Sequence, residues 1–238
     1  SGFESFQMRQ FEILLGLDNN DRIGGMDPLD SFRRMAERGE EHKEVLSMLE
    51  DAVSRPSLVE SLMLWVERTP IMGSGFESDN DQENVQQYVE AHLKAHKTVC
   101  DLASGSSEMM AARMKASHES AISFLKPDGT ASRRRAGLLF IESYRELPLL
   151  AWPRKLIDAV VELEESMVKW RHSHARMVER IMGRRIGTGG TSGVDYLDAT
   201  AEYRIFKDLW AVRTILVKPQ MRPELVNSEF YGYNSSNE

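Results

Sequence analysis

The spacing of hydrophobic residues predicts an almost entirely helical protein. Apolar side chains recur every three or four residues along most of the chain, which is the repeat of a helix with one buried face. The pattern predicts helices over residues 3–16, 29–38, 40–54, 56–69, 82–102, 107–125, 131–146, 154–182 and 192–217. Alternating apolar and polar runs, which would indicate strands, do not occur in the sequence. We therefore expect an all-α fold, a helical bundle.

The sequence predicts one domain over residues 1–218 followed by a polar tail over residues 219–238. It contains no internal repeat and no segment with the composition of a linker. Pro148 and Pro153 are expected to break the chain before the longest helix. The middle of the helix over 131–146 is apolar on nearly every side, so this helix is expected to be buried.

The longest predicted helix has a histidine among its apolar residues. One face of this helix carries Val160, Leu163, Met167, Trp170, His174, Met177 (or Val178) and Ile181. Spacing alone favours a core histidine that is hydrogen-bonded to a neighbour. The alternative is an axial ligand, because haem iron requires a neutral imidazole on a rigid helix in an apolar pocket.

A glycine-rich loop, GRRIGTGGTSG, follows this helix over residues 183–193. Gly183 is a candidate helix C-cap. The loop is not a P-loop or a dinucleotide fingerprint, because it lacks the required lysine and no strand precedes it. Two interpretations remain: a flexible connection between helices, or a loop whose backbone approaches a ligand closely, with Thr188 and the arginines 184 and 185 beside it.

Other candidate sites are weaker. His92 and His96 have the i, i+4 spacing of zinc ligands, but their neighbours are polar and no third ligand is evident, so a solvated helix face is favoured. The basic run SRRRAG (132–137) indicates a solvated face or ion-pair partners in preference to a nucleic-acid site. The tripeptide NSS (234–236) matches a glycosylation acceptor, although nothing indicates secretion.

Composition narrows the function classes. The 238 residues have a net charge of −7, which argues against a general surface for nucleic acids or anionic membranes. Cys100 is the single cysteine, so no internal disulfide can form and a reducing compartment, the cytoplasm, is expected. No apolar run reaches the length of a membrane span.

Taken together, four segments resemble the tryptophan 2,3-dioxygenase family. The most specific is WRHSHARMVERIMGRRIGTGGTSGV (170–194), similar to the family's Trp-Arg-x-x-His-x-x-Met-Val helix and its Gly-Thr-Gly-Gly-x-Ser-Gly loop. SGFESFQMRQFEILLG (1–16), LWVERTP (64–70) and YLDATAEYRIFKDLWAVRTILV (196–217) agree in order and rough spacing. The resemblance covers essentially the whole chain.

The resemblance implies a haem dioxygenase fold and a haem enzyme. Such an enzyme inserts both atoms of O2 into the indole of L-tryptophan and forms N-formylkynurenine, the first step of tryptophan catabolism by the kynurenine route. His174 matches the axial ligand of haem b, with Gly2 and Trp170 also on the cofactor. Thr188, Ser1 and Gly189 match substrate-binding positions. No residue of this chain is assigned as catalytic.

The chain also departs from the family pattern. Family members have a segment before Ser-Gly-Phe that carries the distal histidine and the arginine that binds the substrate carboxylate. Nothing here matches it, so we expect this chain to supply the proximal haem side and to need that N-terminal segment, or a companion chain, for turnover. Family members are homotetramers, and a homotetramer is therefore expected here.

Two alternatives remain for the function: a relative acting on another indole or aromatic amino acid, and a haem-binding helical protein without turnover. The intact histidine and glycine motifs argue against the second. Trp65, Arg68 and Pro70 match a segment linked in animal-type members to a second tryptophan site, although a helix end with a packed tryptophan and a proline stop is favoured.

Overall fold

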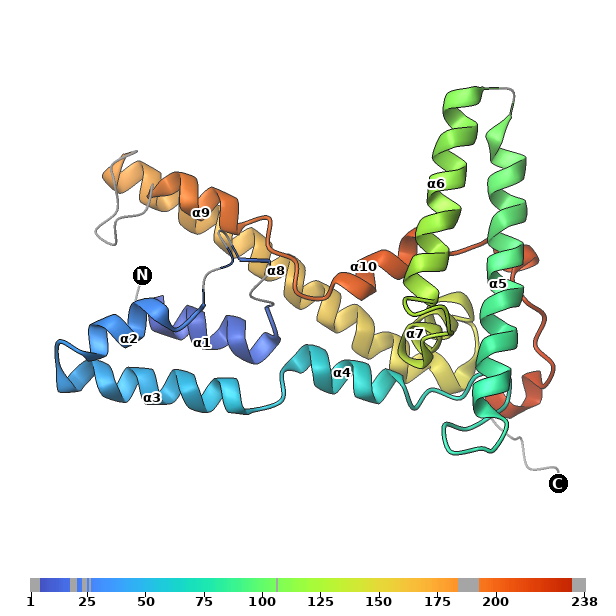
Figure 1. Ribbon diagram of the computed structural model, residues 1–238, viewed down its shortest axis with the longest axis horizontal. Helices are drawn as coiled ribbons and strands as arrows, with labels where there is room; N and C mark the ends of the chain where they lie inside the picture. Colours follow the sequence, from blue (N-terminus) through green and yellow to red (C-terminus); the bar gives the residue numbers. More distant parts are fainter. Residues whose placement is uncertain are drawn as a thin grey trace. The chain divides into compact units, whose positions relative to one another are not determined.

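The computed structural model describes residues 5–17, 21–22, 25, 27–105, 107–183 and 193–232. Over these residues the protein is all-α and contains no strand (Figure 1). The chain forms two compact units. The first, here called the histidine unit, consists of Ser1–Leu62 and Val160–Phe206, and the second consists of Met63–Ala159 and Lys207–Glu238.

Most of the predicted helices are present, with bounds close to those expected from periodicity. The helices are α1 (Ser5–Leu15), α2 (Asp30–Ala36), α3 (Glu40–Ser54), α4 (Leu58–Val66), α5 (Asp81–Ser104), α6 (Glu108–Leu125), α7 (Arg133–Ser143), α8 (Ala151–Met182), α9 (Val194–Thr200) and α10 (Lys207–Thr214). Short 3₁₀ turns occur at η3 (Pro148–Leu150), η4 (Pro219–Met221) and η5 (Ser228–Tyr231). None of these helices combines the length and apolar character needed to cross a bilayer.

The single helix predicted over residues 192–217 is wrong. The chain leaves the helical conformation after α9 and resumes it at α10. The carboxylate of Glu164 on α8 accepts the backbone N–H groups of Ile205 at 2.6 Å and Phe206 at 3.1 Å. These two side chains are buried. A tertiary hydrogen-bond acceptor thus replaces the helical one, and periodicity along the sequence does not reveal it.

The break predicted at Pro153 is also wrong. Helix α8 begins at Ala151, so Pro153 lies in its first turn, where the missing N–H has no helical partner to lose. Pro148 does interrupt the chain, because it starts the 3₁₀ turn η3.

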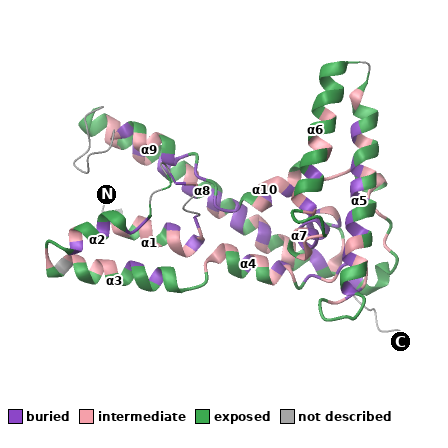
Figure 2. Ribbon diagram, in the orientation of Figure 1, coloured by how far each residue is buried: buried purple, intermediate pink, exposed green. Residues whose placement is uncertain are grey.

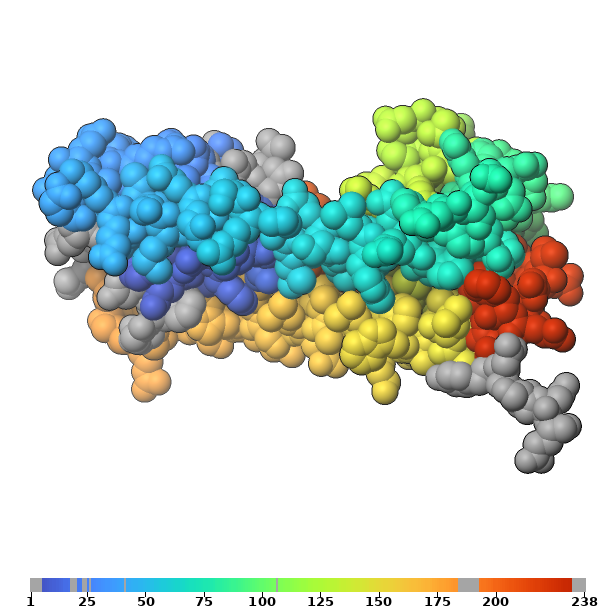
Figure 3. Space-filling model, turned by 90° about the horizontal axis from the view of Figure 1, so that it is seen from below, coloured from blue at the N-terminus to red at the C-terminus, as the bar shows by residue number. Residues whose placement is uncertain are grey.

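In the histidine unit, helices α1, α2 and α3 pack around Leu29, Phe32 and Leu49. Phe6 and Ile13 of α1 pack against this cluster. Figure 3 shows α1 between α3 and the C-terminal part of α8. Helix α1 therefore lies beside the helix that carries His174.

The second unit is built around α7, which is buried from Ala136 to Glu142 as predicted (Figure 2). Phe140 contacts Tyr88, Tyr144 and Tyr231, with ring centroids 5.3, 4.6 and 5.2 Å away. A Cβ atom at Gly137 would lie 2.6 Å from the backbone oxygen of Val66, so α7 can approach α4 this closely only with glycine there.

The tail predicted over 219–238 contributes to this core. Tyr231 is fully buried, its hydroxyl donates to the carbonyl of Pro70 at 3.1 Å, and it accepts from the backbone N–H of Gly73 at 2.8 Å. Part of the segment predicted to be a polar tail is therefore packed inside the second unit.

The solvated face predicted for His92 and His96 is wrong. Both are buried on α5, in line with Val85, Val89 and Cys100. Nε2 of His92 donates to the carbonyl of Ile215 at 2.9 Å, and Nδ1 of His96 lies 3.3 Å from Nδ1 of His118. The polar residues around them occupy the other faces of the same helix, which obscured the buried stripe. Among the described residues no group of three donors could hold a metal ion.

The basic run over 132–137 consists of ion-pair partners, as predicted. Arg133 contacts Asp81 at 2.7 Å, Arg134 contacts Glu67 at 2.9 Å and Arg135 contacts Asp208 at 3.0 Å.

Replacing Glu164 with leucine should destabilise the protein by about 3 kcal/mol, because two buried backbone N–H groups would lose their acceptor. Glu165→Leu is the matched control, since Glu165 is exposed and should change stability by less than about 0.5 kcal/mol. Urea unfolding followed by circular dichroism measures both. Equal stabilities for the two variants would contradict this account of the break before α10.

His92 should make stability depend on pH. Burial lowers the pKa of His92 to about 4, whereas in the unfolded chain it is about 6.5. The neutral ring therefore stabilises the fold fully above about pH 6.5, and this contribution is lost as the pH falls toward 4. Between about pH 7.5 and about pH 5 the loss should be about 2 kcal/mol.

The measurement is urea unfolding at those two pH values for the parent protein and His92→Gln, whose amide can still donate to Ile215. The variant should lose about 2 kcal/mol less than the parent. His172→Gln, which replaces an exposed histidine of α8, should behave as the parent does. The same pH response in the parent and His92→Gln would show that His92 is not the titrating group.

Candidate functional site

His174 lies on a partly open face of α8 and not in the buried stripe predicted for it. The predicted stripe repeats every seven residues, and its members become more exposed along the helix. Val160 and Met167 are 5% and 6% exposed, His174 is half-buried, and Ile181 is 74% exposed. Seven residues fall about 20° short of two full turns of a straight α-helix, so such a stripe rotates away from the buried face.

The buried face of α8 shares Val160 and Met167 with this stripe and then departs from it. Glu164, Met167, Arg171 and Ala175 are buried, at spacings of three and four residues. Because Arg171 and Ala175 flank His174 in sequence and are both buried, the imidazole lies on the adjoining side of the helix.

Apolar side chains surround His174 on its open face. The rings of Trp170 and His174 are stacked, with centroids 5.1 Å apart and planes 8° from parallel. Trp170 and Met177 are each 39% exposed, and Met182 is also exposed. Within the described part of the chain no group hydrogen-bonds to the imidazole. The result is a stacked imidazole on a rigid helix with exposed apolar neighbours.

A cluster of buried charges holds α8 through its adjoining, buried side. Nη2 of Arg171 donates to Oε1 of Glu12 at 3.0 Å, and Nη1 of Arg22 donates to Oε2 of the same carboxylate at 2.9 Å. The side chains of Arg171 and Arg22 are each 3% exposed and that of Glu12 is 8% exposed. The guanidinium of Arg171 also lies over the ring of Tyr203, 5.3 Å from its centroid. We call Glu12, Arg22 and Arg171 the Glu12 cluster.

The Glu12 cluster fixes the angle of α8 around its axis. Glu12 belongs to α1, and Tyr203 belongs to the segment between α9 and α10. Removing one partner from a buried ion pair leaves an uncompensated charge, which costs several kcal/mol. Arg171 is held between α1 and the segment that joins α9 to α10. Trp170 and His174 are consequently directed away from the buried face.

This face fits haem as far as its residues are described. The iron of haem needs a nitrogen ligand, and the flat porphyrin needs apolar side chains beside it. The face provides one imidazole with no competing hydrogen bond among the described groups, and the exposed side chains of Trp170, Met177 and Ile181.

The end of α8 is fixed close to this face. Gly183 adopts φ +65°, the left-handed conformation of a helix C-cap, and its N–H donates to the carbonyl of Glu179 at 2.8 Å, as the sequence predicted. Arg176 of α8 forms an ion pair with Asp198 of α9, and the pKa of Arg176 is raised, first by its hydrogen bond to that carboxylate. The ion pair therefore joins α8 and α9, the two helices on either side of the glycine loop.

Four of the residues predicted for the site, Ser1, Gly2, Thr188 and Gly189, lie outside the described residues. Trp65, Arg68 and Pro70, the candidates for a second tryptophan site, lie at the end of α4. Trp65 and Pro70 are half-buried and Arg68 is exposed. This geometry is that of a helix end, and the second site stays a prediction.

Sequence reasoning missed Glu12 and the position of Arg171. The Trp-Arg motif was the one available signal for Arg171, because a charged residue beside an apolar stripe is ordinarily a solvated flank of the helix. Glu12 had no such signal, since it occupies an ordinary position in an amphipathic helix.

Comparison with known proteins gives consistent matches. The model of the tryptophan 2,3-dioxygenase family matches residues 1–216. A tryptophan 2,3-dioxygenase-like protein of Xanthomonas campestris pv. campestris is 41% identical, over 98% of this chain and 92% of the relative. Tryptophan 2,3-dioxygenase 2 of Ralstonia nicotianae is 39% identical and tryptophan 2,3-dioxygenase of Sorangium cellulosum is 38% identical, each over 98% of this chain.

The chain spans 68% of the Ralstonia relative and 61% of the Sorangium relative. The family match extends from the first residue through α10 and includes the His174 face, the Glu12 cluster and the glycine loop. The chain belongs to the tryptophan 2,3-dioxygenase family.

Proposed function

We propose that this chain supplies the proximal haem side of a dioxygenase that converts L-tryptophan and O2 to N-formylkynurenine. Membership of the family supports the reaction class. The reaction inserts both oxygen atoms into the substrate and therefore needs no external reductant.

The observation that carries the proposal is the stacked pair of Trp170 and His174 on the open, apolar face of α8. A histidine kept only for packing would be buried or hydrogen-bonded to its neighbours. Here the imidazole is half-buried, and its ring orientation is restricted by Trp170. This arrangement suits a ligand that must present one nitrogen to a metal.

Haem iron, when bound at this face, supplies the redox chemistry that activates O2. His174 donates its imidazole nitrogen, and Trp170 limits rotation of that ring. The Glu12 cluster holds α8 so that the imidazole position is fixed before haem binds. Exposed apolar residues such as Met177 would be covered by bound haem. They would then exclude water from the side of the haem that faces His174.

The substrate-binding and remaining cofactor residues are proposed from the family motif. Thr188, Gly189 and Ser1 would contact the substrate, and Gly2 the haem. The distal histidine and the carboxylate-binding arginine would come from an N-terminal segment or a companion chain. We further propose a cytoplasmic homotetramer, following the family.

The alternatives are a different aromatic amino acid as substrate, or haem binding without turnover. The first is open because the substrate-reading groups lie mostly outside the described residues. The relatives from Ralstonia and Sorangium are named as tryptophan 2,3-dioxygenases, which favours tryptophan.

Removing the imidazole should abolish axial ligation. His174→Ala, supplied with haem, should show a weakened or shifted Soret band and bind haem about tenfold or more weakly than the parent. His172→Ala is the matched control, because His172 is exposed and two residues away on the same helix. It should give the parent spectrum. Identical spectra for His174→Ala and the parent would overturn the ligand assignment.

Turnover should require the complementing segment. The haem-loaded protein, mixed with the N-terminal segment of a full-length relative and L-tryptophan under ¹⁸O2, should release a product carrying both labelled atoms, measured by mass spectrometry. His174→Ala should form none above background. Haem binding without product from tryptophan or from a panel of indole amino acids would favour the non-catalytic alternative.

A further inference from the structure

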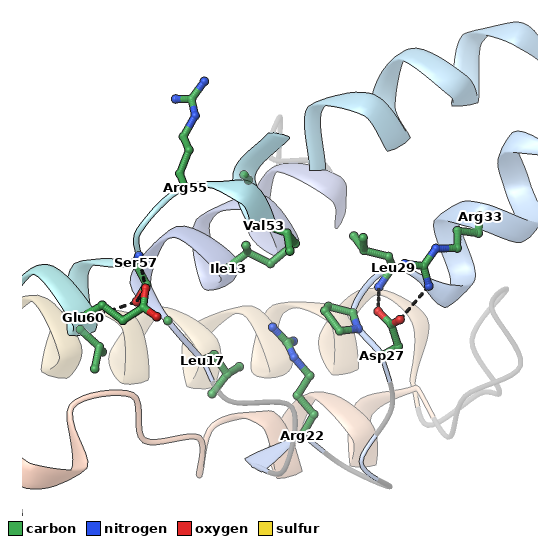
Figure 4. A pocket seen from close by; sticks show the side chains of 14 residues that line it. Ile13, Leu17, Arg22, Asp27, Leu29, Arg33, Val53, Arg55, Ser57 and Glu60 are labelled. Carbon is green, nitrogen blue, oxygen red and sulfur yellow. Dashed lines mark hydrogen bonds and ion pairs between the residues drawn. The ribbon is translucent and has the colours of Figure 1, made fainter. Parts of the chain in front are cut away.

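A pocket lies in the histidine unit, between α1, the segment after it, and the junction of α3 and α4 (Figure 4). Its volume is about 470 Å³. Ile13, Leu17, Leu29 and Val53 form apolar walls, and Arg22 points into the space between them. His174 and Trp170 do not line this pocket.

Arg22 has an unused donor edge at this pocket. Its Nη1 donates to Glu12 at 2.9 Å, while Nε and Nη2 are buried and have no hydrogen-bond partner among the residues that the structure describes. The Nε–H and the near Nη2–H of a guanidinium point in parallel, and together they bind both oxygens of one carboxylate. Leaving two such N–H groups buried and unpaired costs free energy.

The hydrogen-bonded charges of the Glu12 cluster do not balance. Two buried guanidiniums, Arg22 and Arg171, share the single carboxylate of Glu12. Arg9, which is less buried, adds a third contact to Glu12 at 3.4 Å. A buried cation without its own anion is strongly unfavourable, so this cluster has room for one more negative charge.

The acidic residues that line the pocket are already engaged. Oδ1 of Asp27 accepts the backbone N–H of Leu29 at 2.8 Å, and Oδ2 accepts from Arg33 at 2.7 Å. These bonds hold the pKa of Asp27 below its usual value, first through the Leu29 N–H. Glu60 accepts the N–H of Ser57 at 2.8 Å at the start of α4. The charge of Arg22 also lowers the pKa of Asp27, but neither carboxylate hydrogen-bonds to Nε or Nη2 of Arg22.

We propose that this pocket binds a small monocarboxylic acid with an apolar body, whose carboxylate pairs with Nε and Nη2 of Arg22. The apolar walls fit the body of such a ligand, and the volume is within the range of small-molecule sites. The carboxylates of Asp27 and Glu60 would repel a dianion such as phosphate. The site is separate from the His174 face and does not rest on the proposed function.

The test is isothermal titration calorimetry on the haem-free full chain with a panel of probes. Acetate, phenylpropionate and indole-3-acetate vary the apolar body, and indole-3-acetamide keeps the shape of the last while removing its charge. Inorganic phosphate tests the anion class. We expect one molecule of an aromatic carboxylate to bind per chain, at least about tenfold more tightly than acetate, the amide or phosphate.

Two variants locate the binding. Arg22→Met removes the free edge while leaving Glu12 paired with Arg171, and Val53→Trp fills the pocket from its exposed rim while leaving the Glu12 cluster intact. Each should weaken the carboxylate about tenfold or more. Val226→Trp, at a valine that is 89% exposed in the second unit, is the matched control and should bind as the parent does.

The proposal is overturned if no carboxylate of the panel binds, if the acid and amide bind equally, or if phosphate binds best. It is also overturned if affinity survives in Val53→Trp, which remains informative should Arg22→Met fail to fold. His174→Ala must keep the affinity, because loss there would place the probe at the haem-binding face.

Discussion

The arrangement of the histidine unit depends on one carboxylate that serves two buried guanidiniums. Glu12 on α1 accepts hydrogen bonds from Arg171 of α8 and from Arg22. In a low-dielectric interior these contacts are strong, and losing any partner leaves a buried charge exposed to an apolar environment. The packing of α1 against α8 is therefore specified by charge as well as by apolar contact. These contacts fix the orientation of α8 about its own axis.

The fixed orientation of α8 gives two sides of the helix different roles. The side of α8 with Glu164 and Arg171 binds the rest of the unit through hydrogen bonds to backbone and carboxylate groups. The side with Trp170 and His174 stays available to a ligand. Fixing the helix through the adjoining side would pre-organise His174 without occupying its nitrogen atoms. Among the described residues the same cluster leaves Nε and Nη2 of Arg22 unpaired, so the proposed carboxylate site and the proposed haem face depend on the same constraint.

Local patterns predicted the helices well, and tertiary interactions account for the errors. Three- and four-residue spacings identified α1 to α8 because packing in helices follows the same period. The break before α10 depends on Glu164, which lies some forty residues earlier. His92 was assigned to a solvated face because its sequence neighbours are polar, although they occupy other sides of α5. His174 is partly exposed because a stripe that repeats every seven residues turns gradually away from the buried face of a straight helix. The spacing of apolar residues alone does not predict this exposure.

The central claim is that Arg171, buried on the adjoining side of α8, positions the imidazole that we propose as the haem ligand. The most direct test is the haem affinity of Arg171→Met, measured by titration at conditions where circular dichroism shows an intact fold. Lys169→Met is the control, since Lys169 is an exposed cation of the same helix whose ion pair with Glu165 lies within α8. The account predicts weaker haem binding, by about tenfold, in Arg171→Met alone. Parent-like haem affinity in a folded Arg171→Met protein would contradict it.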